Sequence, residues 1–154
     1  MLSDLMRYTV YDAQAKKVTL QKEIEYLHSY IALQKLRFGN EVKIDCSIML
    51  DKEENAYTIE PMLLIPFIEN AFKHGAGYSE QSWINIKVSV INGTITFEVC
   101  NSYENTLAAS KDEASGIGIS NVKSRLNLLY KGKYNVVIND KNNIFHVILT
   151  LMLT

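Results

Sequence analysis

Hydrophobic positions along the chain follow two different periods, and these periods separate predicted helices from predicted strands. In the segment 20–38 apolar residues recur at intervals of four, three and four, at Leu20, Ile24, Leu27 and Ile31. This spacing is typical of one face of an amphipathic helix. Thr19 is a suitable N-cap and Gly39 a suitable stop, so the pattern predicts a helix over 20–38.

Alternation of apolar and polar residues predicts the strands. Segment 41–50 alternates Val42, Ile44, Cys46 and Ile48 with polar neighbours, as a half-buried strand does. Segments 83–91 and 94–101 are joined by Asn92-Gly93, a strong signal for a tight hairpin. Segments 134–139 and 145–153 are predicted to form a second hairpin.

Three further segments favour helices, and one favours a loop. Residues 2–11 suggest a short amphipathic helix. Residues 61–74 suggest a helix with an irregular start, in which Pro61 suits the first turn and Pro66 is expected to cost a hydrogen bond or force a kink. A helical stripe runs from Ile119 to Leu129. The polar segment 102–115 buries little and is interpreted as a mobile lid.

These elements predict an α+β fold. Three substantial helices and about five strands, mostly joined as hairpins, favour a two-layer α/β sandwich. Its sheet would be mixed but mostly antiparallel, and its helices would cover one face.

The composition of the chain disfavours nucleic-acid binding, membrane contact and a metal site built from cysteines. The chain has 154 residues, enough for one ordinary domain, and its formal charge of -1 gives no field that would attract nucleic acid. No apolar stretch approaches the roughly 20 residues of a membrane helix, so no membrane contact is expected. Cys46 and Cys100 lack metal-ligand spacing and are interpreted as buried thiols in a reducing compartment.

The candidate chemistry begins with the run Glu69-Asn70-Ala71-Phe72-Lys73-His74-Gly75. Asn70, Lys73 and His74 are spaced i, i+3 and i+4, so they share one helical face. An amide oxygen can join the shell of Mg2+, a lysine can neutralise phosphate, and an imidazole offers an aromatic plane. Glu69 is suited to polarising a nucleophile or orienting a metal-bound water.

Two glycines at a predicted helix start complete a nucleotide pocket. At Gly116 and Gly118 backbone N–H groups can approach an anion closely, and the helix N-terminus carries partial positive charge. The third glycine of a dinucleotide fold and the Gly-Lys-Ser/Thr of a Walker loop are both missing, which disfavours those two phosphate sites.

Structural roles are the alternative interpretation for single residues. Glu69 and Lys73 would also suit an exposed i, i+4 ion pair, which stabilises a helix by about 0.3 kcal/mol. His74 would suit a cation near the negative end of the helix dipole. The combination of the two segments favours the nucleotide pocket.

A longer series of motifs resembles the catalytic domain of LytS-type sensor histidine kinases, within the GHKL (Bergerat) superfamily that includes gyrase B and MutL. The series runs in order through Tyr30 to Gln34, Arg37-Phe38, Pro61 to Pro66, Glu69 to Gly75, Gly116 to Val122, Arg125-Leu126 and Leu129-Tyr130. It covers nearly the whole chain. The resemblance implies a protein histidine kinase that uses ATP and Mg2+.

The resemblance also implies roles for the candidate residues. Asn70 would bind Mg2+, Lys73 would contact phosphate, His74 would line the adenine or ribose wall, and Glu69 would lie beside the transferred phosphoryl group. The backbone of the glycine motif would meet the phosphates, through Gly116, Ile117, Gly118 and Ile119.

One position departs from the family pattern. Asn101 stands where the family usually has the aspartate of an Asp-x-Gly motif, which accepts a hydrogen bond from the adenine amino group. The following glycines are replaced by Ser102-Tyr103-Glu104. An asparagine carbonyl still accepts such a bond, but a neutral acceptor makes a weaker one.

The phosphate acceptor of this family is a histidine on an upstream dimerising helix, and no such motif occurs in this chain. His28 and His146 suit an exposed helix position and a sheet face. Residues 1–18 are interpreted as the end of that helix plus a linker, and residues 19–154 as the ATP-binding domain. The expected protein is a cytoplasmic domain of a homodimeric inner-membrane receptor, whose partners are the histidine-bearing helix and a response regulator.

Two other functions remain open at this level. One is an ATPase or serine kinase of the same superfamily, in which nucleotide closes a lid. The other is a degenerate kinase domain, weakened at Asn101, that serves as a scaffold for a partner.

Overall fold

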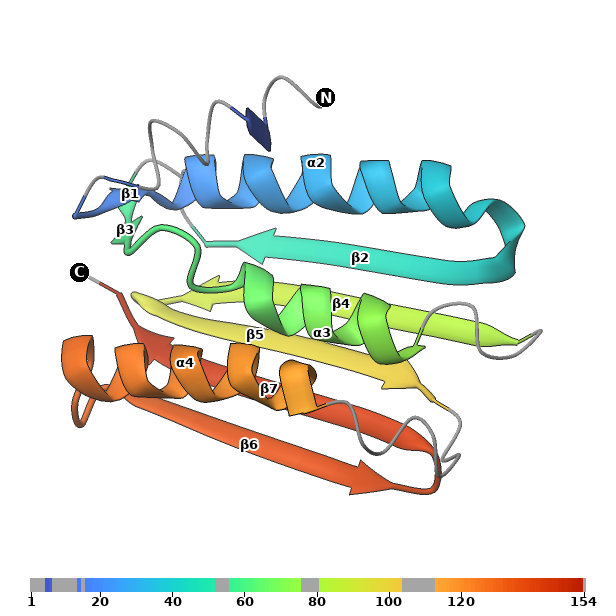
Figure 1. Ribbon diagram of the computed structural model, residues 1–154. Helices are drawn as coiled ribbons and strands as arrows, with labels where there is room; N and C mark the ends of the chain where they lie inside the picture. The colour runs from blue at the N-terminus through green and yellow to red at the C-terminus, as the bar shows by residue number, and fades with distance from the viewer. Residues whose placement is uncertain are drawn as a thin grey trace.

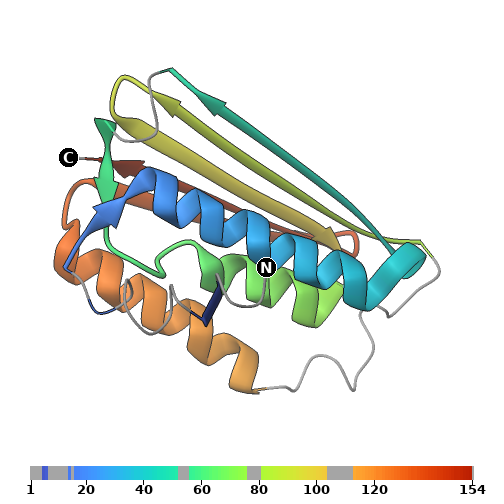
Figure 2. The ribbon, with the colours of Figure 1, turned by 90° about the horizontal axis from the view of Figure 1, so that it is seen from above.

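Three long helices lie side by side on one face of a five-stranded sheet, as the two views in Figures 1 and 2 show. The computed structural model describes residues 5–6, 14, 16–51, 56–75, 81–103 and 113–153, with the backbone alone at 113–117. The α+β two-layer sandwich expected from the sequence is confirmed within these residues.

The sheet is mixed, in the order β2-β4-β5-β7-β6. Its strands are β2 (Val42–Leu50), β4 (Ser82–Ile91), β5 (Thr94–Ser102), β6 (Tyr134–Lys141) and β7 (Ile144–Met152). The pair β2 and β4 is parallel, and the other neighbours are antiparallel. Two further strands, β1 (Val18–Thr19) and β3 (Thr58–Ile59), form a small separate pair that the sequence pattern did not predict.

Both hairpins close through residues with positive φ. Asn92 and Gly93 have φ of 52° and 78°, and Asn142 and Asn143 have φ of 56° and 60°. Two consecutive residues of this kind match the right-handed twist of the strands that they join. The second turn uses asparagines because their short polar side chains tolerate this conformation.

Helix α2 (Leu20–Phe38) has the bounds that the sequence predicts. The Thr19 side chain accepts a hydrogen bond from the Lys22 N–H, and Gly39 ends the helix with φ of 56° and donates its N–H to the Lys35 carbonyl. A short 3-10 turn, η2 (Gly39–Glu41), leads into β2. Both ends of α2 are therefore set by local sequence.

Helix α3 (Ile65–Gly75) begins later than expected, because residues 61–64 form turns. Pro66 is consequently the second residue of the helix, where its missing N–H has no intrahelical partner to lose. The expected hydrogen-bond loss or kink at Pro66 was therefore wrong. The buried ring of Phe67 lies 6.1 Å from that of Phe97, which joins α3 to the middle of the sheet.

Helix α4 (Glu113–Leu129) begins earlier than the hydrophobic stripe suggested. Its first three residues belong to the segment interpreted as a lid, and β5 extends to Ser102 at the other end of that segment. The rest of the expected lid lies outside the described residues. Most of the helix predicted over 2–11 also lies outside the described residues; within it, Leu5 and Met6 are described and are helical.

The two cysteines are free and half-buried, rather than fully buried as expected. Burial raises the pKa of both thiols. Cys46 lies on the helix-covered side of β2, where Ile44 and Ile48 are also partly shielded.

Candidate functional site

Helix α3 carries most of the candidate residues and lies between α2 and α4 (Figure 1). It packs against α4 and against strands β4 and β5. The two sequence segments that were expected to form a nucleotide pocket, on α3 and α4, therefore lie side by side on the same face of the sheet.

The four candidate residues of α3 differ in exposure. Glu69 and Lys73 are exposed, whereas Asn70 and His74 are half-buried. The spacing of Asn70, Lys73 and His74 within a regular helix puts them on one face, as predicted. The opposite face carries Phe67, Ile68 and Ala71, which are buried in the core between α3 and the sheet.

The end of α3 lies directly on the end of β5. A β-carbon added at Gly75 would lie 2.8 Å from the Asn101 Nδ2 atom and 2.9 Å from the Ser102 carbonyl oxygen. Only glycine lets the helix approach the strand this closely. Asn101, predicted from the family pattern alone, is thereby placed beside Gly75.

Asn101 is the buried polar group of this site, with 1% of its surface exposed. Its Nδ2 atom donates a 3.0 Å hydrogen bond to the Ser102 carbonyl, and its Oδ1 atom has no hydrogen-bond partner among the described residues. A buried acceptor without a partner is costly, so such atoms often mark a ligand site. The bond from Nδ2 fixes which end of the amide is free, and that end is an acceptor.

The glycine motif occupies the first turns of α4 and not a loop before it. Gly116, Ile117, Gly118 and Ile119 are all helical, so the expected position at the helix mouth is shifted into the helix itself. Apart from its chain neighbours and the backbone of its own helix, no atom of the described residues lies within 4 Å of a β-carbon built at Gly118, so the helix surface there is open. The helix N-terminus nearby offers N–H groups without intrahelical partners.

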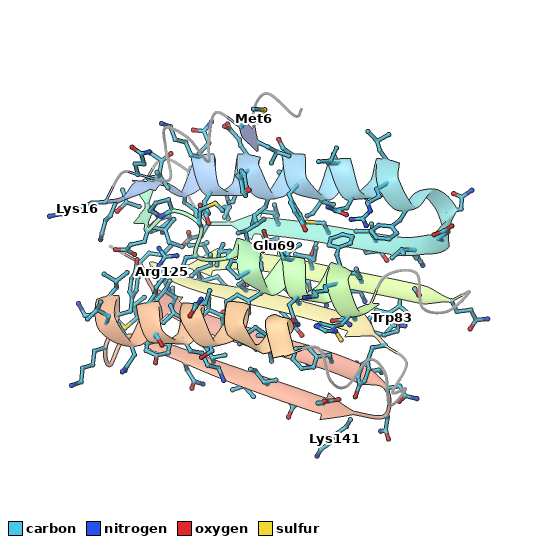
Figure 3. The ribbon with its side chains drawn as sticks, in the orientation of Figure 1. Met6, Lys16, Glu69, Trp83, Arg125 and Lys141 are labelled. Carbon is cyan, nitrogen blue, oxygen red and sulfur yellow. The ribbon has the colours of Figure 1, made fainter. Side chains whose placement is uncertain are left out.

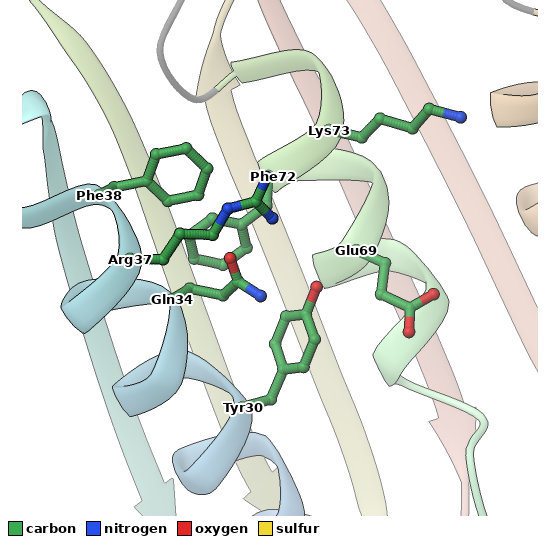
Figure 4. A pocket seen from close by; sticks show the side chains of 7 residues that line it. All are labelled: Tyr30, Gln34, Arg37, Phe38, Glu69, Phe72 and Lys73. Carbon is green, nitrogen blue, oxygen red and sulfur yellow. The ribbon is translucent and has the colours of Figure 1, made fainter. Parts of the chain in front are cut away.

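A pocket of about 360 Å³ lies on the other side of α3, between α3 and α2 (Figure 4). It is lined by aromatic, amide and charged side chains, namely Tyr30, Gln34, Arg37, Phe38, Glu69, Phe72 and Lys73. The Oε1 atom of Gln34 is buried, and no described residue gives it a hydrogen bond. In Figure 4 the Lys73 side chain extends away from Arg37, so Lys73 lies at the border of this pocket.

The pocket changes the acidity of two groups. Burial raises the pKa of Glu69, although its side chain is exposed at the surface. Burial, followed by the nearby Glu69 carboxylate, raises the pKa of Tyr30 to about 12. Both groups therefore favour their neutral forms more than they would in water.

Three polar pocket residues on α2 were part of the family pattern but had no role assigned from the sequence. Tyr30, Gln34 and Arg37 are spaced i, i+4 and i+7, so they form one polar stripe along α2. That periodicity was a usable signal, but nothing local shows that α3 lies opposite the stripe.

The donor set fits magnesium bound with phosphate rather than by protein alone. Among the described residues no group of three or more His, Cys, Asp or Glu side chains is placed to hold a metal ion. Mg2+ often takes one or two protein oxygens and completes its shell with phosphate and water. The amide of Asn70 suits that arrangement.

Comparisons with known proteins agree with the architecture. Residues 61–152 match the GHKL domain family, and residues 1–42 match the Histidine kinase family. The chain is 30% identical over 141 residues to the sensor protein kinase HptS of Staphylococcus aureus, covering 92% of this chain and 24% of that protein. It thus spans about a quarter of the length of the curated relatives it matches.

Solved structures show the same fold at low sequence identity. Full-length ShkA in complex with AMPPNP aligns over 99% of this chain and 34% of its own, with a TM-score of 0.63 and 13% identity. The histidine kinase ThkA in complex with the response regulator TrrA aligns over 99% and 47%, with a TM-score of 0.55 and 15% identity. In the described part of this chain, every helix is too short or too polar to cross a membrane.

Proposed function

Because this chain belongs to the GHKL family as the catalytic domain of a sensor histidine kinase, we propose that it binds Mg-ATP and delivers the γ-phosphoryl group to a histidine. The observation that carries the proposal is Asn101, a buried acceptor at the junction of α3 and β5 to which the described part of the chain supplies no donor. An adenine amino group would supply the hydrogen bond that Oδ1 lacks.

The other candidate residues would hold the phosphate end of the nucleotide. Lys73 would neutralise phosphate charge, and the N–H groups of the first turn of α4, up to Gly116, would donate to the phosphates. Ile117, Gly118 and Ile119 lie further into the helix, where their N–H groups have intrahelical partners, so they would border the phosphates without donating to them. His74 lies next to Gly75 and would cover one side of the base or sugar. Asn70 would supply one oxygen to Mg2+, which when bound screens the phosphate charge.

Catalysis would come mainly from positioning and charge neutralisation. In the transfer a histidine ring nitrogen attacks the γ-phosphorus, a new P–N bond forms, and the bond to the ADP oxygen breaks. Glu69, at the surface of α3, is suited to accept a proton or to orient the incoming imidazole. Burial raises the pKa of Glu69 toward neutral pH, and a general base works best when its pKa is close to the working pH.

The acceptor histidine and the further partners belong to the whole receptor. We propose that a histidine-bearing dimerisation helix precedes this domain in a homodimeric membrane receptor, as in a sensor protein kinase such as HptS. The domain would then be cytoplasmic. A response regulator would receive the phosphoryl group, as the crystallised pair of ThkA and TrrA suggests for that kinase.

Calorimetric titration with Mg-ADP tests the first step. We expect saturable heat for the wild type and a loss of the magnesium-dependent part in Asn70→Ala. The matched control is Asn127→Ala, an exposed asparagine on α4, which should bind as the wild type does. Heat equal to that of dilution at millimolar ligand, from a folded sample, would contradict the proposal.

The same titration, together with an ATP hydrolysis assay, separates the alternatives. A lid-closing ATPase or serine kinase would also bind nucleotide, but it would hydrolyse ATP steadily without an upstream helix. A scaffold weakened at Asn101 would fold normally and bind no nucleotide.

A further inference from the structure

The loop that leads into α3 is held by two charged side chains from two other helices. The Glu23 carboxylate, on α2, accepts hydrogen bonds from the backbone N–H groups of Met62 (3.2 Å), Leu63 (3.2 Å) and Leu64 (3.5 Å). The Arg125 guanidinium, on α4, donates to the carbonyls of Pro61 (3.0 Å) and Met62 (3.3 Å). Figure 3 shows Arg125 beside this loop.

Glu23 depends on these hydrogen bonds because it is fully buried, with 0% of its surface exposed. A buried carboxylate is tolerated when hydrogen-bond donors satisfy it, and charge-assisted bonds are roughly twice as strong as neutral ones. Met62 has φ of 62°, a left-handed conformation that a non-glycine residue rarely adopts. Such a conformation persists only where surrounding contacts impose it.

The loop is also tied to the start of α2. The Leu20 N–H donates to the Tyr57 carbonyl over 2.9 Å, and β1 pairs with β3 immediately before residues 60–64. Tyr26 lies one turn after Glu23 on α2. Burial raises the pKa of its phenol, and the nearby carboxylates of Glu69 and Glu23 raise it further. Glu23, which holds the loop, and Glu69, on the surface of α3, therefore both lie near Tyr26.

Helix α3 starts at Ile65, one residue after the last held N–H group. The direction and rotation of a helix follow from how its first residues are fixed, and Glu69 and Asn70 lie about one turn further along. A small change in the loop would move both side chains, and misplacement by about 1 Å is enough to impair a reacting geometry.

We propose that Glu23 and Arg125 are positioning residues that set the orientation of α3 and so link α2 and α4 to the nucleotide site. This inference rests on the proposed function. Neither residue touches the nucleotide; each acts through the backbone of residues 61–64. A movement of α2 relative to α4 would be transmitted to Asn70 through this loop.

The test compares Mg-ADP affinity with folding stability in Glu23→Gln and Arg125→Lys. Glu23→Gln replaces one acceptor oxygen with a donor that opposes the loop N–H groups, and we expect about tenfold weaker binding. Arg125→Lys cannot bridge two carbonyls and should weaken binding about threefold. The control is Val147→Ala, a buried strand residue on β7, which should lower the melting temperature but leave affinity unchanged in the folded state.

A second readout does not depend on ligand. Amide hydrogen exchange without nucleotide should become at least about tenfold faster at the first turn of α3 in Glu23→Gln than at β4 of the same variant. If the wild type gives no heat with Mg-ADP, the proposed function fails and this inference fails with it. If the wild type binds and both folded variants bind equally well, the inference alone is overturned; Arg125→Lys serves this purpose should Glu23→Gln not fold.

Discussion

Asn101 shows how the hydrogen bonds of one side chain determine what it can bind. Its amide nitrogen is used by Ser102, and its oxygen is left as a buried acceptor. The neighbouring Gly75 leaves no room for another side chain at this point. The chemistry available to a ligand here is therefore limited to a donor that approaches Oδ1.

Asn101→Asp tests this reading of the adenine contact. A charged acceptor makes a hydrogen bond stronger by about 1 kcal/mol, so Mg-ADP affinity should rise about fivefold. The free protein should lose about 1 to 3 kcal/mol of unfolding free energy, because a buried charge would face the Ser102 carbonyl. Calorimetry and urea unfolding measure the two effects. Unchanged affinity in the folded variant would place adenine elsewhere.

Glu69 gives a pH-dependent prediction. Its pKa is raised by burial, so the folded chain holds this proton more tightly than the unfolded chain does. The resulting stability is fully present below the unfolded pKa of about 4.3 and is lost as pH rises through the higher folded pKa. Glu69→Gln should remove that loss.

We therefore expect Glu69→Gln to lose less unfolding free energy than the wild type between pH 4 and pH 7. The difference should be under about 1 kcal/mol, because the side chain is exposed and solvent screens it. Urea unfolding at the two pH values measures it. Glu41→Gln, at an exposed carboxyl beyond the end of α2, is the matched control. A larger loss in Glu69→Gln would show that the sign is wrong.

At the scale of elements, the end of α3 lies tightly against the end of β5 at Gly75. Helix α3 is amphipathic, with its apolar face against the sheet and its polar residues toward solvent. Gly75 then decides how near its end comes to Asn101. In contrast, Gly118 on α4 borders open space, so a β-carbon there meets nothing.

The two glycines should respond oppositely to alanine. Gly75→Ala would place a β-carbon 2.8 Å from Asn101 Nδ2, and the overpacking should cost about 1 to 3 kcal/mol of unfolding free energy. Gly118→Ala should gain up to about 1 kcal/mol, since alanine favours a helix interior. Thermal unfolding compares the two. If Gly118→Ala is stabilised yet binds Mg-ADP more weakly, its added methyl group obstructs the phosphates.

At the scale of the whole molecule, the sheet separates two different surfaces. The helices cover one face, and the other face is open (Figure 2). His146 lies on the open face, where its Nε2 atom is 2.5 Å from the Glu98 carboxylate. The candidate nucleotide residues of α3 and α4 lie on the helical side, so this imidazole cannot reach them within one chain.

This arrangement predicts that the domain alone does not phosphorylate itself. His146 is behind the sheet, and His28 is an exposed residue two positions before Tyr30, so it points away from the pocket that Tyr30 lines. Incubation with radiolabelled ATP should leave this chain unlabelled. A receptor that includes the upstream helix should be labelled on a histidine of that helix. Stoichiometric labelling of any of the three histidines of the chain, His28, His74 or His146, would contradict the prediction.

Periodicity and caps were sufficient to locate α2, the two hairpins and the α+β architecture, because these features depend on residues within a few positions of one another. The bounds of α2 and the turn at Asn92-Gly93 are examples. The nucleotide motifs were readable for the same reason, although their roles remain proposals. Local rules misjudged Pro66, since the start of α3 is set by contacts from elsewhere in the chain.

Long-range contacts carry no periodic signal, and they needed three-dimensional coordinates. Glu23 and Met62 are 39 positions apart, and Met62 and Arg125 are 63 apart. The pocket between α2 and α3 and the free oxygen of Asn101 also arise where distant segments pack. Short-range hydrogen bonding and hydrophobic burial thus determine the elements, whereas the packing of α2, α3 and α4 determines which side chains meet.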